Sequence, residues 1–428
     1  MVMRFLRGLE QGLISAAVCL AGATFLTSAA HAQDSFPFGA FGSDQKSNAR
    51  TYDKSFIKEW EGNPPPGFPT LASVNIEATK TAIRRYTDIV SAGGWKTVPE
   101  VKVRPGDAHF VVTVLRDRLI ASGDYKGDPS ADETYDGDLE DAVKRFQATN
   151  GLTPTGLVDE RTLAALNVSA EARLKQLKVN LARLTELAGV TKSQSKYVVV
   201  NVPAAQVEAV EDSRVVSRHT GVVGKPERPT PLLRSTITDL NFNPVWRLPP
   251  TVITKDLIPN GKALQSEGQS ILAKMGIDAY GASGKKLDPL EVDFNSSAVS
   301  GYSYSQQPGK SNPLGFLKIN FASSESVYMH DTPKDSLFGR NFRADSSGCI
   351  RVANIAVLAE WLLRANPGWS MDVIDRLKTS GERRDIRLKK PVPLYFAYIT
   401  AWATEDGIVQ FRRDLYSRDG AGETAAAY

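Results

Sequence analysis

A thiol and an imidazole stand close together late in the chain. Cys349 follows Ser346-Ser347-Gly348, and His330 lies nineteen residues upstream. A cysteine becomes a nucleophile for acyl transfer when a nearby base takes its proton and backbone N–H groups hold the oxyanion. We therefore predict Cys349 as the nucleophile, in a thiolate–imidazolium pair with His330 as general acid and base. Gly348 lets the backbone turn, and we predict its N–H as an oxyanion donor.

The other cysteine lies in a segment with the features of a secretory signal. Two arginines precede an apolar stretch from Leu13 to Leu26, and Ala30-His31-Ala32 fits a small-x-small cleavage site. We expect cleavage after Ala32, which removes Cys19 and leaves no segment that spans a membrane. Cys349 is then the lone thiol of an exported chain, and this favours a catalytic role over an inert buried cysteine.

Other kinds of site find little support. Three histidines remain in the expected mature chain, His109, His219 and His330, and their spacing with one cysteine suits no zinc site, so we expect no metal and no cofactor. We expect His109 at a helix start and His219 packed on a strand. A net charge of +4 with interspersed signs gives no reason to expect nucleic acid. The string Ser55-Phe56-Ile57-Lys58 matches a penicillin-binding nucleophile, but it has no partner motifs.

Hydrophobic periodicity changes near residue 193. Before this point three- and four-residue steps predict helices over 73–90, 107–122, 139–146 and 171–188, with a short helix capped by Asp159. After it, apolar and alternating runs predict strands over 197–202, 207–210, 215–223, 235–242, 317–321, 327–330, 371–374 and 392–402, and one helix over 355–365. Residues 255–311 have an irregular pattern. The sequence thus predicts an α+β protein with a helical first half and a mainly β second half.

The motif resembles a known family. His330, fifteen residues, and then Ser346-Ser347-Gly348-Cys349-Ile350-Arg351 closely resemble the L,D-transpeptidase catalytic domain of YkuD type. Four further stretches are similar to the large Gram-negative subfamily of YcbB type: Val223–Pro231, Phe242–Trp246, Asn312–Gly315 and His330–Pro333. The resemblance covers most of residues 70–415. Many members carry a second histidine where this chain has Ser347, which leaves His330 as the one imidazole of the motif.

The resemblance implies a reaction on peptidoglycan stem peptides. Cysteine attack at the third residue, meso-diaminopimelate, releases D-alanine, and an amine of a second stem then gives a 3→3 cross-link. Three alternatives stay open: an L,D-carboxypeptidase or endopeptidase that uses water, attachment of an outer-membrane protein to peptidoglycan, and a non-catalytic wall-binding scaffold.

Other residues of the motif region are candidates for supporting roles. Arg351 suits a substrate carboxylate or a structural ion pair. Ser347 occupies a motif position that can support the oxyanion. The expected substrate contacts are Tyr328, Trp246 and Asn354. The resemblance further implies that a backbone carbonyl orients the imidazole and that residues of about 255–311 form a capping insertion.

A second motif lies in the helical half. Ala142-Val143-Lys144-Arg145-Phe146-Gln147, followed by Gly151-Leu152, resembles a peptidoglycan-binding domain. We expect the chain to work in the Gram-negative periplasm. The expected organisation begins with a signal peptide (1–32), an irregular tether (33–70), a helical scaffold (71–132 and 171–192) and a small three-helix peptidoglycan-binding unit (133–170). A mainly β catalytic domain (193–376) follows. The last part is a C-terminal extension (377–428) that packs on the catalytic domain and ends in a disordered tail.

Overall fold

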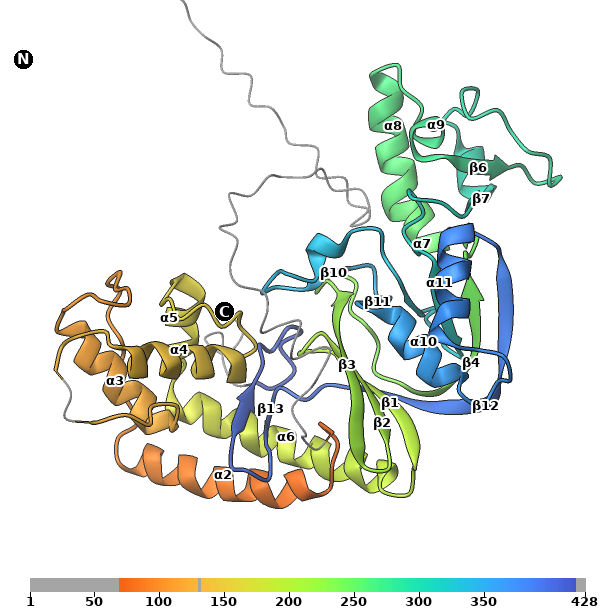
Figure 1. Ribbon diagram of the computed structural model, residues 1–428. Helices are drawn as coiled ribbons and strands as arrows, with labels where there is room; N and C mark the ends of the chain where they lie inside the picture. Colours follow the sequence, from red (N-terminus) through yellow and green to blue (C-terminus); the bar gives the residue numbers. More distant parts are fainter. Residues whose placement is uncertain (1–68, 130–131, 421–428) are drawn as a thin grey trace, which may run out of the picture. The chain divides into compact units, whose positions relative to one another are not determined.

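A computed structural model describes residues 69–129 and 132–420 (Figure 1). The predicted signal peptide, nearly all of the predicted tether and the tail from residue 421 lie outside these ranges. Within them, no helix is both long and apolar enough to cross a membrane.

Two long helices and a hairpin form the scaffold. Helices α2 (Val74–Ser91) and α6 (Ala170–Thr191) pack against each other and against the hairpin of β13 (Ala401–Ala403) and β14 (Val409–Phe411). Their shared core is apolar and includes Tyr86, Leu177 and Phe411. The hairpin comes from the far end of the sequence, so the scaffold is built from segments near both ends of the described region.

The three helices between α2 and α6 form one small unit. These are α3 (Val111–Ser122), α4 (Gly137–Thr149) and α5 (Glu160–Leu166). The predicted stripe of α4 is buried, and its members are Leu139, Ala142, Val143 and Phe146. The Asp159 carboxylate accepts from the N–H of Thr162, which confirms the predicted cap of α5.

A nine-stranded sheet forms the C-terminal half, which confirms the α+β class. Its order is β10-β3-β11-β9-β8-β4-β12-β1-β2. A further pairing of β2 with β3 closes the strands from β3 to β2 into a ring, and β10 lies outside this ring. The strands are β1 (Lys196–Asn201), β2 (Gln206–Glu211), β3 (Arg214–Gly224), β4 (Arg234–Phe242), β8 (Leu317–Phe321), β9 (Met329–His330), β10 (Ala344–Ser346), β11 (Ile350–Val352) and β12 (Arg384–Ala397).

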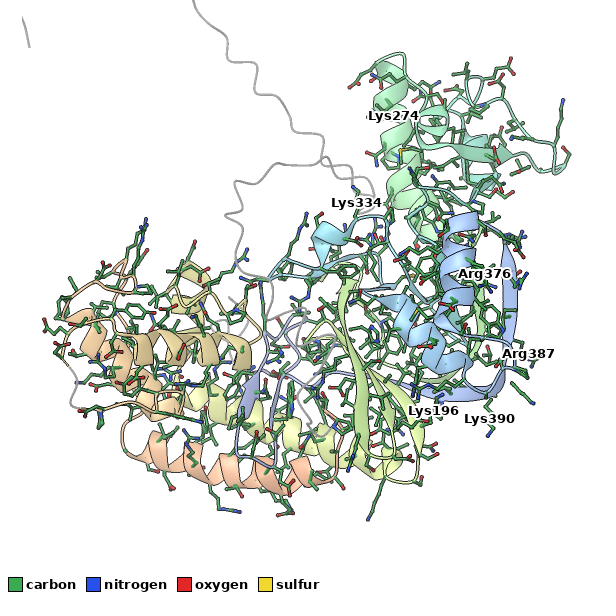
Figure 2. The ribbon with its side chains drawn as sticks, viewed as in Figure 1. Lys196, Lys274, Lys334, Arg376, Arg387 and Lys390 are labelled. Carbon is green, nitrogen blue, oxygen red and sulfur yellow. The ribbon has the colours of Figure 1, made fainter. Side chains whose placement is uncertain are left out.

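Helices α10 (Ile355–Leu363) and α11 (Met371–Ser380) pack on the core of this sheet. The Lys196 ammonium at the start of β1 (Figure 2) donates to the Trp361 carbonyl and lies 4.1 Å from the centre of the Trp361 ring. These contacts tie α10 to the sheet. The strand predicted over 371–374 is wrong, because these residues begin the amphipathic helix α11. The sheet also takes in β12, so it extends past the boundary predicted at 376.

The segment predicted to be irregular is an ordered insertion. After β5 (Trp246–Arg247) come α7 (Pro250–Val252), a π-helix η1 (Ile253–Leu257), α8 (Ile258–Ser266), α9 (Ile271–Met275), β6 (Ile277–Tyr280), a 3-10 helix η2 (Ser297–Gly301) and β7 (Ser303–Gln306). Strands β5, β7 and β6 form a separate sheet with its own core around Leu257 and Phe294. The prediction of irregular structure was therefore wrong. The elements are too short for a clear period, and their apolar residues converge only in three dimensions.

His219 is packed inside β3, as expected. Its Nδ1 lies 2.9 Å from the Ala353 carbonyl, and burial lowers the pKa of the imidazole to about 4. Below an ordinary histidine pKa of about 6.5 the unfolded chain then binds a proton that the folded chain does not. Stability contributed by His219 is therefore present above pH 6.5 and is lost as the pH falls toward 4.

This difference predicts an acid-sensitive fold. Between pH 6.5 and 4 we expect the free energy of unfolding to fall by up to about 1.4 kcal/mol per pH unit for such a histidine. Chemical denaturation at several pH values measures this slope. His219→Gln makes this slope smaller, and His109→Gln, at a half-exposed imidazole beside α3, is the histidine control outside the sheet. Equal slopes for His219→Gln and wild type would contradict the assignment.

Candidate active site

Strand register brings the two halves of the motif together. Strands β9 and β11 are parallel neighbours, with Met329 opposite Ile350 and His330 opposite Arg351. Met329 and Ile350 are fully buried in the core of the sheet. Because side chains alternate along a strand, Tyr328, His330, Cys349 and Arg351 share the other face. Tyr328 is thus the register neighbour of Cys349, and His330 stands one residue further along.

The Cys349 side chain is half-buried, and the thiol is free. Burial raises the pKa of this thiol, and hydrogen bonds from Tyr328 and the positive charges of Lys318 and Arg351 lower it in part. The groups that favour the thiolate are therefore present, and they do not outweigh its desolvation in the substrate-free chain.

His330 is also neutral at rest. Its Nδ1 lies 2.5 Å from the Asp331 carbonyl oxygen, so Nδ1 carries the proton and Nε2 is the basic nitrogen. Burial, Arg351 and Lys318 lower the pKa of the imidazole to about 3. A backbone carbonyl does orient the ring, as expected. Burial disfavours both charged forms and so argues against a resting thiolate–imidazolium pair, which stays a prediction.

The loop before Cys349 is fixed by hydroxyl groups. Gly348 has φ +113°, and its N–H donates to Ser346 Oγ at 3.1 Å. Ser346 Oγ donates in turn to the Cys349 carbonyl at 2.5 Å, and Thr230 Oγ1 donates to the Gly348 carbonyl at 2.9 Å. The Gly348 N–H is thereby occupied, so the geometry does not support the predicted role as oxyanion donor.

Ser347 belongs to a link with the insertion. Its Oγ accepts from Arg228 Nη1 at 2.9 Å, and Arg228 Nη2 donates to Asp256 Oδ1 of η1 at 2.7 Å. The Asp256 side chain is buried, and this hydrogen bond raises the pKa of Arg228. The Ser347 hydroxyl therefore joins the loop before Cys349 to the insertion. This position does not support its predicted role in holding the oxyanion.

Tyr328 is the polar centre of the site. Burial and the neighbouring Cys349 raise its pKa well above the ordinary value, while a hydrogen bond from Trp246 lowers it in part. The Lys318 ammonium lies 4.2 Å from the centre of the Tyr328 ring. The sequence analysis missed Lys318. Lys318 lies opposite His330 because β8 pairs with β9, and the sequence alone does not show this pairing. The one signal in the sequence is that Lys318 is a polar residue in an alternating strand.

Arg351 is a buried cation with donors to spare. It is 5% exposed, and its Nε and Nη1 have no hydrogen-bond partner within the described ranges. No salt bridge joins Arg351 to a carboxylate within those ranges, so the structural ion pair considered for it is not formed there. Asn354, by contrast, is exposed in a left-handed turn (φ +49°) that begins α10. In the same ranges no three histidine, cysteine or carboxylate side chains cluster as metal ligands.

Comparisons with known proteins agree with this geometry. Residues 195–379 match the family model YkuD, described as "L,D-transpeptidase catalytic domain", and residues 111–166 match a "Putative peptidoglycan binding domain". The second match begins ahead of the boundary predicted at 133 and so includes α3.

A Haemophilus influenzae protein named "Putative L,D-transpeptidase" is 30% identical over 224 residues, covering 51% of this chain and 44% of that protein. The chain thus spans less than half the length of this relative. Crystal structures of L,D-transpeptidases from Xylanimonas cellulosilytica and Stackebrandtia nassauensis align at 17% and 13% identity over 70% and 69% of this chain and 99% and 94% of theirs, with TM-scores of 0.23 and 0.26. By sequence, residues 195–379 are therefore similar to L,D-transpeptidase catalytic domains of YkuD type, and residues 111–166 ahead of them are similar to peptidoglycan-binding domains.

Proposed function

We propose that the chain forms 3→3 cross-links in peptidoglycan by cysteine acyl transfer. The observation that carries this proposal is the shared face of Tyr328, His330, Cys349 and Arg351 beside Lys318, within a transpeptidase domain. A thiol, a neutral imidazole and two cations suit attack on an anionic peptide. The predicted signal and the peptidoglycan substrate favour action in the periplasm.

The proposed reaction starts from neutral partners. The Cys349 sulfur attacks the carbonyl carbon of the meso-diaminopimelate that precedes D-alanine, while its proton passes to Nε2 of His330. The oxyanion receives the N–H of Cys349, since that of Gly348 is occupied, and the Tyr328 hydroxyl. His330 returns the proton to the D-alanine amine as the C–N bond breaks. An amine of a second stem then attacks the thioester, loses its proton to His330 and releases the Cys349 thiol.

We assign Arg351 to a carboxylate of the donor stem. A buried guanidinium with two unpartnered donors costs stability until an anion arrives. Arg351→Met should therefore leave the free energy of unfolding unchanged or higher and lower kcat/KM roughly 10- to 150-fold, the worth of about 1.5–3 kcal/mol for charged hydrogen bonds. Arg364→Met, at an exposed arginine after α10, is the matched control. A destabilised Arg351→Met chain with normal kcat/KM would refute the assignment.

Weighing reaction products tests the proposed function against its alternatives. Purified chain is incubated with disaccharide tetrapeptides, and the products are separated and weighed. Cross-linked dimers that have lost one D-alanine are the expected result. Tripeptide monomers alone indicate hydrolysis by water. Adding an outer-membrane protein with accessible lysines detects attachment as a muropeptide-sized mass increase. No change in any arm indicates a wall-binding scaffold.

A further inference from the structure

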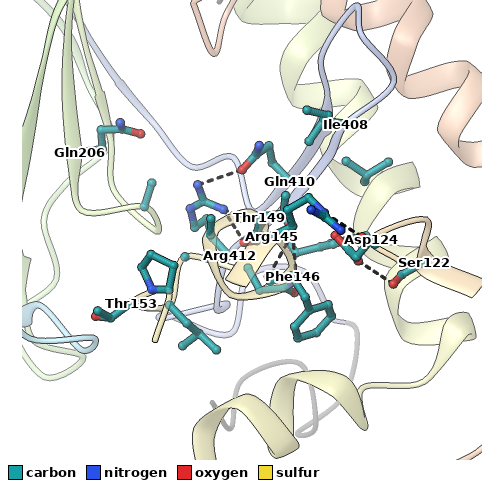
Figure 3. Close-up of a pocket in the computed structure, with 18 of the residues that line it drawn as sticks. Ser122, Asp124, Arg145, Phe146, Thr149, Thr153, Gln206, Ile408, Gln410 and Arg412 are labelled. Atoms are coloured by element: carbon teal, nitrogen blue, oxygen red, sulfur yellow. Dashed lines mark hydrogen bonds between the residues drawn. The ribbon is translucent and has the colours of Figure 1, made fainter. Parts of the chain in front are cut away.

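A cavity of about 520 Å³ lies apart from the catalytic candidates (Figure 3). Its wall is built from the ends of α3 and α4, from α2, from the β13–β14 hairpin and from two loops of the catalytic domain. None of Cys349, His330, Tyr328 and Arg351 lines it. Its size is in the range of sites that hold small organic ligands.

The wall of this cavity is strongly basic. Eight arginine and lysine side chains line it, against the carboxylates of Asp124 and Asp406. Asp406 already accepts from Thr404 and Ile408 of its own turn. Figure 3 shows Arg145 and Arg412 donating to main-chain oxygens of Asp124 and Thr149. Because cationic side chains outnumber carboxylates among the described lining residues, the wall favours an anion.

Two buried side chains on the wall have donors without partners. Arg118, 3% exposed, gives its Nε to the Leu166 carbonyl, while its Nη1 has no hydrogen-bond partner in the described ranges. Gln206, 5% exposed and coming from β2, has an unpartnered Nε2. Buried donors are normally satisfied, so these two unmet donors in the lining of one cavity point to an acceptor that binds there. Burial and the neighbouring Arg173 lower the pKa of Arg118 to about 10, so it stays charged at neutral pH.

Apolar surface accompanies these charges. Tyr86, Phe146, Leu152 and Phe411 also line the cavity. A free inorganic anion makes no use of such surface, whereas an acidic peptide with aliphatic parts meets both kinds of wall. A peptidoglycan stem peptide carries several carboxylates on short aliphatic side chains.

We propose that this cavity is a second, non-catalytic site that binds the carboxylates of an acidic stem peptide. This inference rests on the proposed function only for the choice of a stem peptide as the ligand. One wall comes from the peptidoglycan-binding domain and the opposite one from catalytic-domain loops, so a stem held here anchors a wall strand while another stem reacts at Cys349.

Calorimetric binding to the full chain tests the site. Cys349 is first acylated with a carbapenem, which blocks the active site, and the mass shift verifies this step. The probe is the tetrapeptide L-Ala-γ-D-Glu-meso-diaminopimelate-D-Ala. We expect saturable binding that weakens roughly tenfold in Arg85→Gln, which removes a cavity charge on α2. Arg84→Gln, at the exposed neighbour that does not line this cavity, is the matched control and should bind as wild type.

Further arms make the outcomes decisive. Lys126→Gln, at an exposed lysine of the cavity, should also weaken binding, and it keeps the test valid if Arg85→Gln fails to fold. A peptide with amidated carboxylates should not bind. No binding, or equal effects of Arg84→Gln and Arg85→Gln, overturns the proposal, and so does full competition by equimolar inorganic phosphate. If the chain resists acylation, the proposed function fails, and the same variants are then compared in untreated chain.

Discussion

We expect Cys349→Ala to abolish the covalent adduct that the wild-type chain should form with a carbapenem. The reason is that Cys349 is the single thiol of the described ranges and the only one we assign to bond formation. Loss of sulfur leaves no group at this position that can attack a carbonyl. Intact-protein mass spectrometry reads the result as a shift in wild type and none in the variant.

A matched control separates chemistry from folding. Alanine at position 349 removes only a half-buried sulfur, so thermal unfolding of the variant should stay close to that of wild type. An adduct of full mass on the folded Cys349→Ala chain would refute the nucleophile and with it the proposed mechanism.

His330→Gln slows acylation by roughly 10²- to 10⁴-fold at pH 7. Glutamine keeps a polar side chain of similar reach but cannot take the thiol proton. Without this base the reaction depends on the small fraction of thiolate, because burial raises the pKa of Cys349. Stopped-flow measurement of carbapenem acylation gives the ratio, and His109→Gln serves as a histidine control outside the site.

The pH profile tests the lowered pKa of His330. This pKa is about 3, so Nε2 stays unprotonated as the pH falls from 7 to 5, and wild-type acylation should show no inflection near 6.5. As the pH rises toward 9, the thiolate fraction grows without a base, so the variant should accelerate more than wild type. A wild-type inflection near pH 6.5, absent from His330→Gln, would show that the imidazole keeps its ordinary pKa and would contradict the lowered value.

Local signals were enough for the helical half and the motif. The α4 stripe and the Asp159 cap are set by residues three and four apart, and the spacing of His330 from Cys349 fits two adjacent short strands. These features depend on near neighbours in the sequence, so the sequence predicts them well.

Features that depend on register or on distant segments were missed. Parallel pairing places Tyr328, and not His330, opposite Cys349, and no local pattern encodes that offset. Residues 371–374 look apolar enough for a strand, and the helical period appears only when the window reaches Leu377. The basic cavity joins side chains from five parts of the chain, so its net charge cannot be seen in any one segment.

The Arg228 bridge has a consequence for inhibition. One guanidinium holds both Asp256 in the insertion and Ser347 beside the nucleophile. Any substitution that shifts η1 is therefore transmitted to the acylation loop without touching a reacting atom. We expect substitutions at such a position to change the rate of acylation by a carbapenem, so the insertion as well as the motif bears on inhibition.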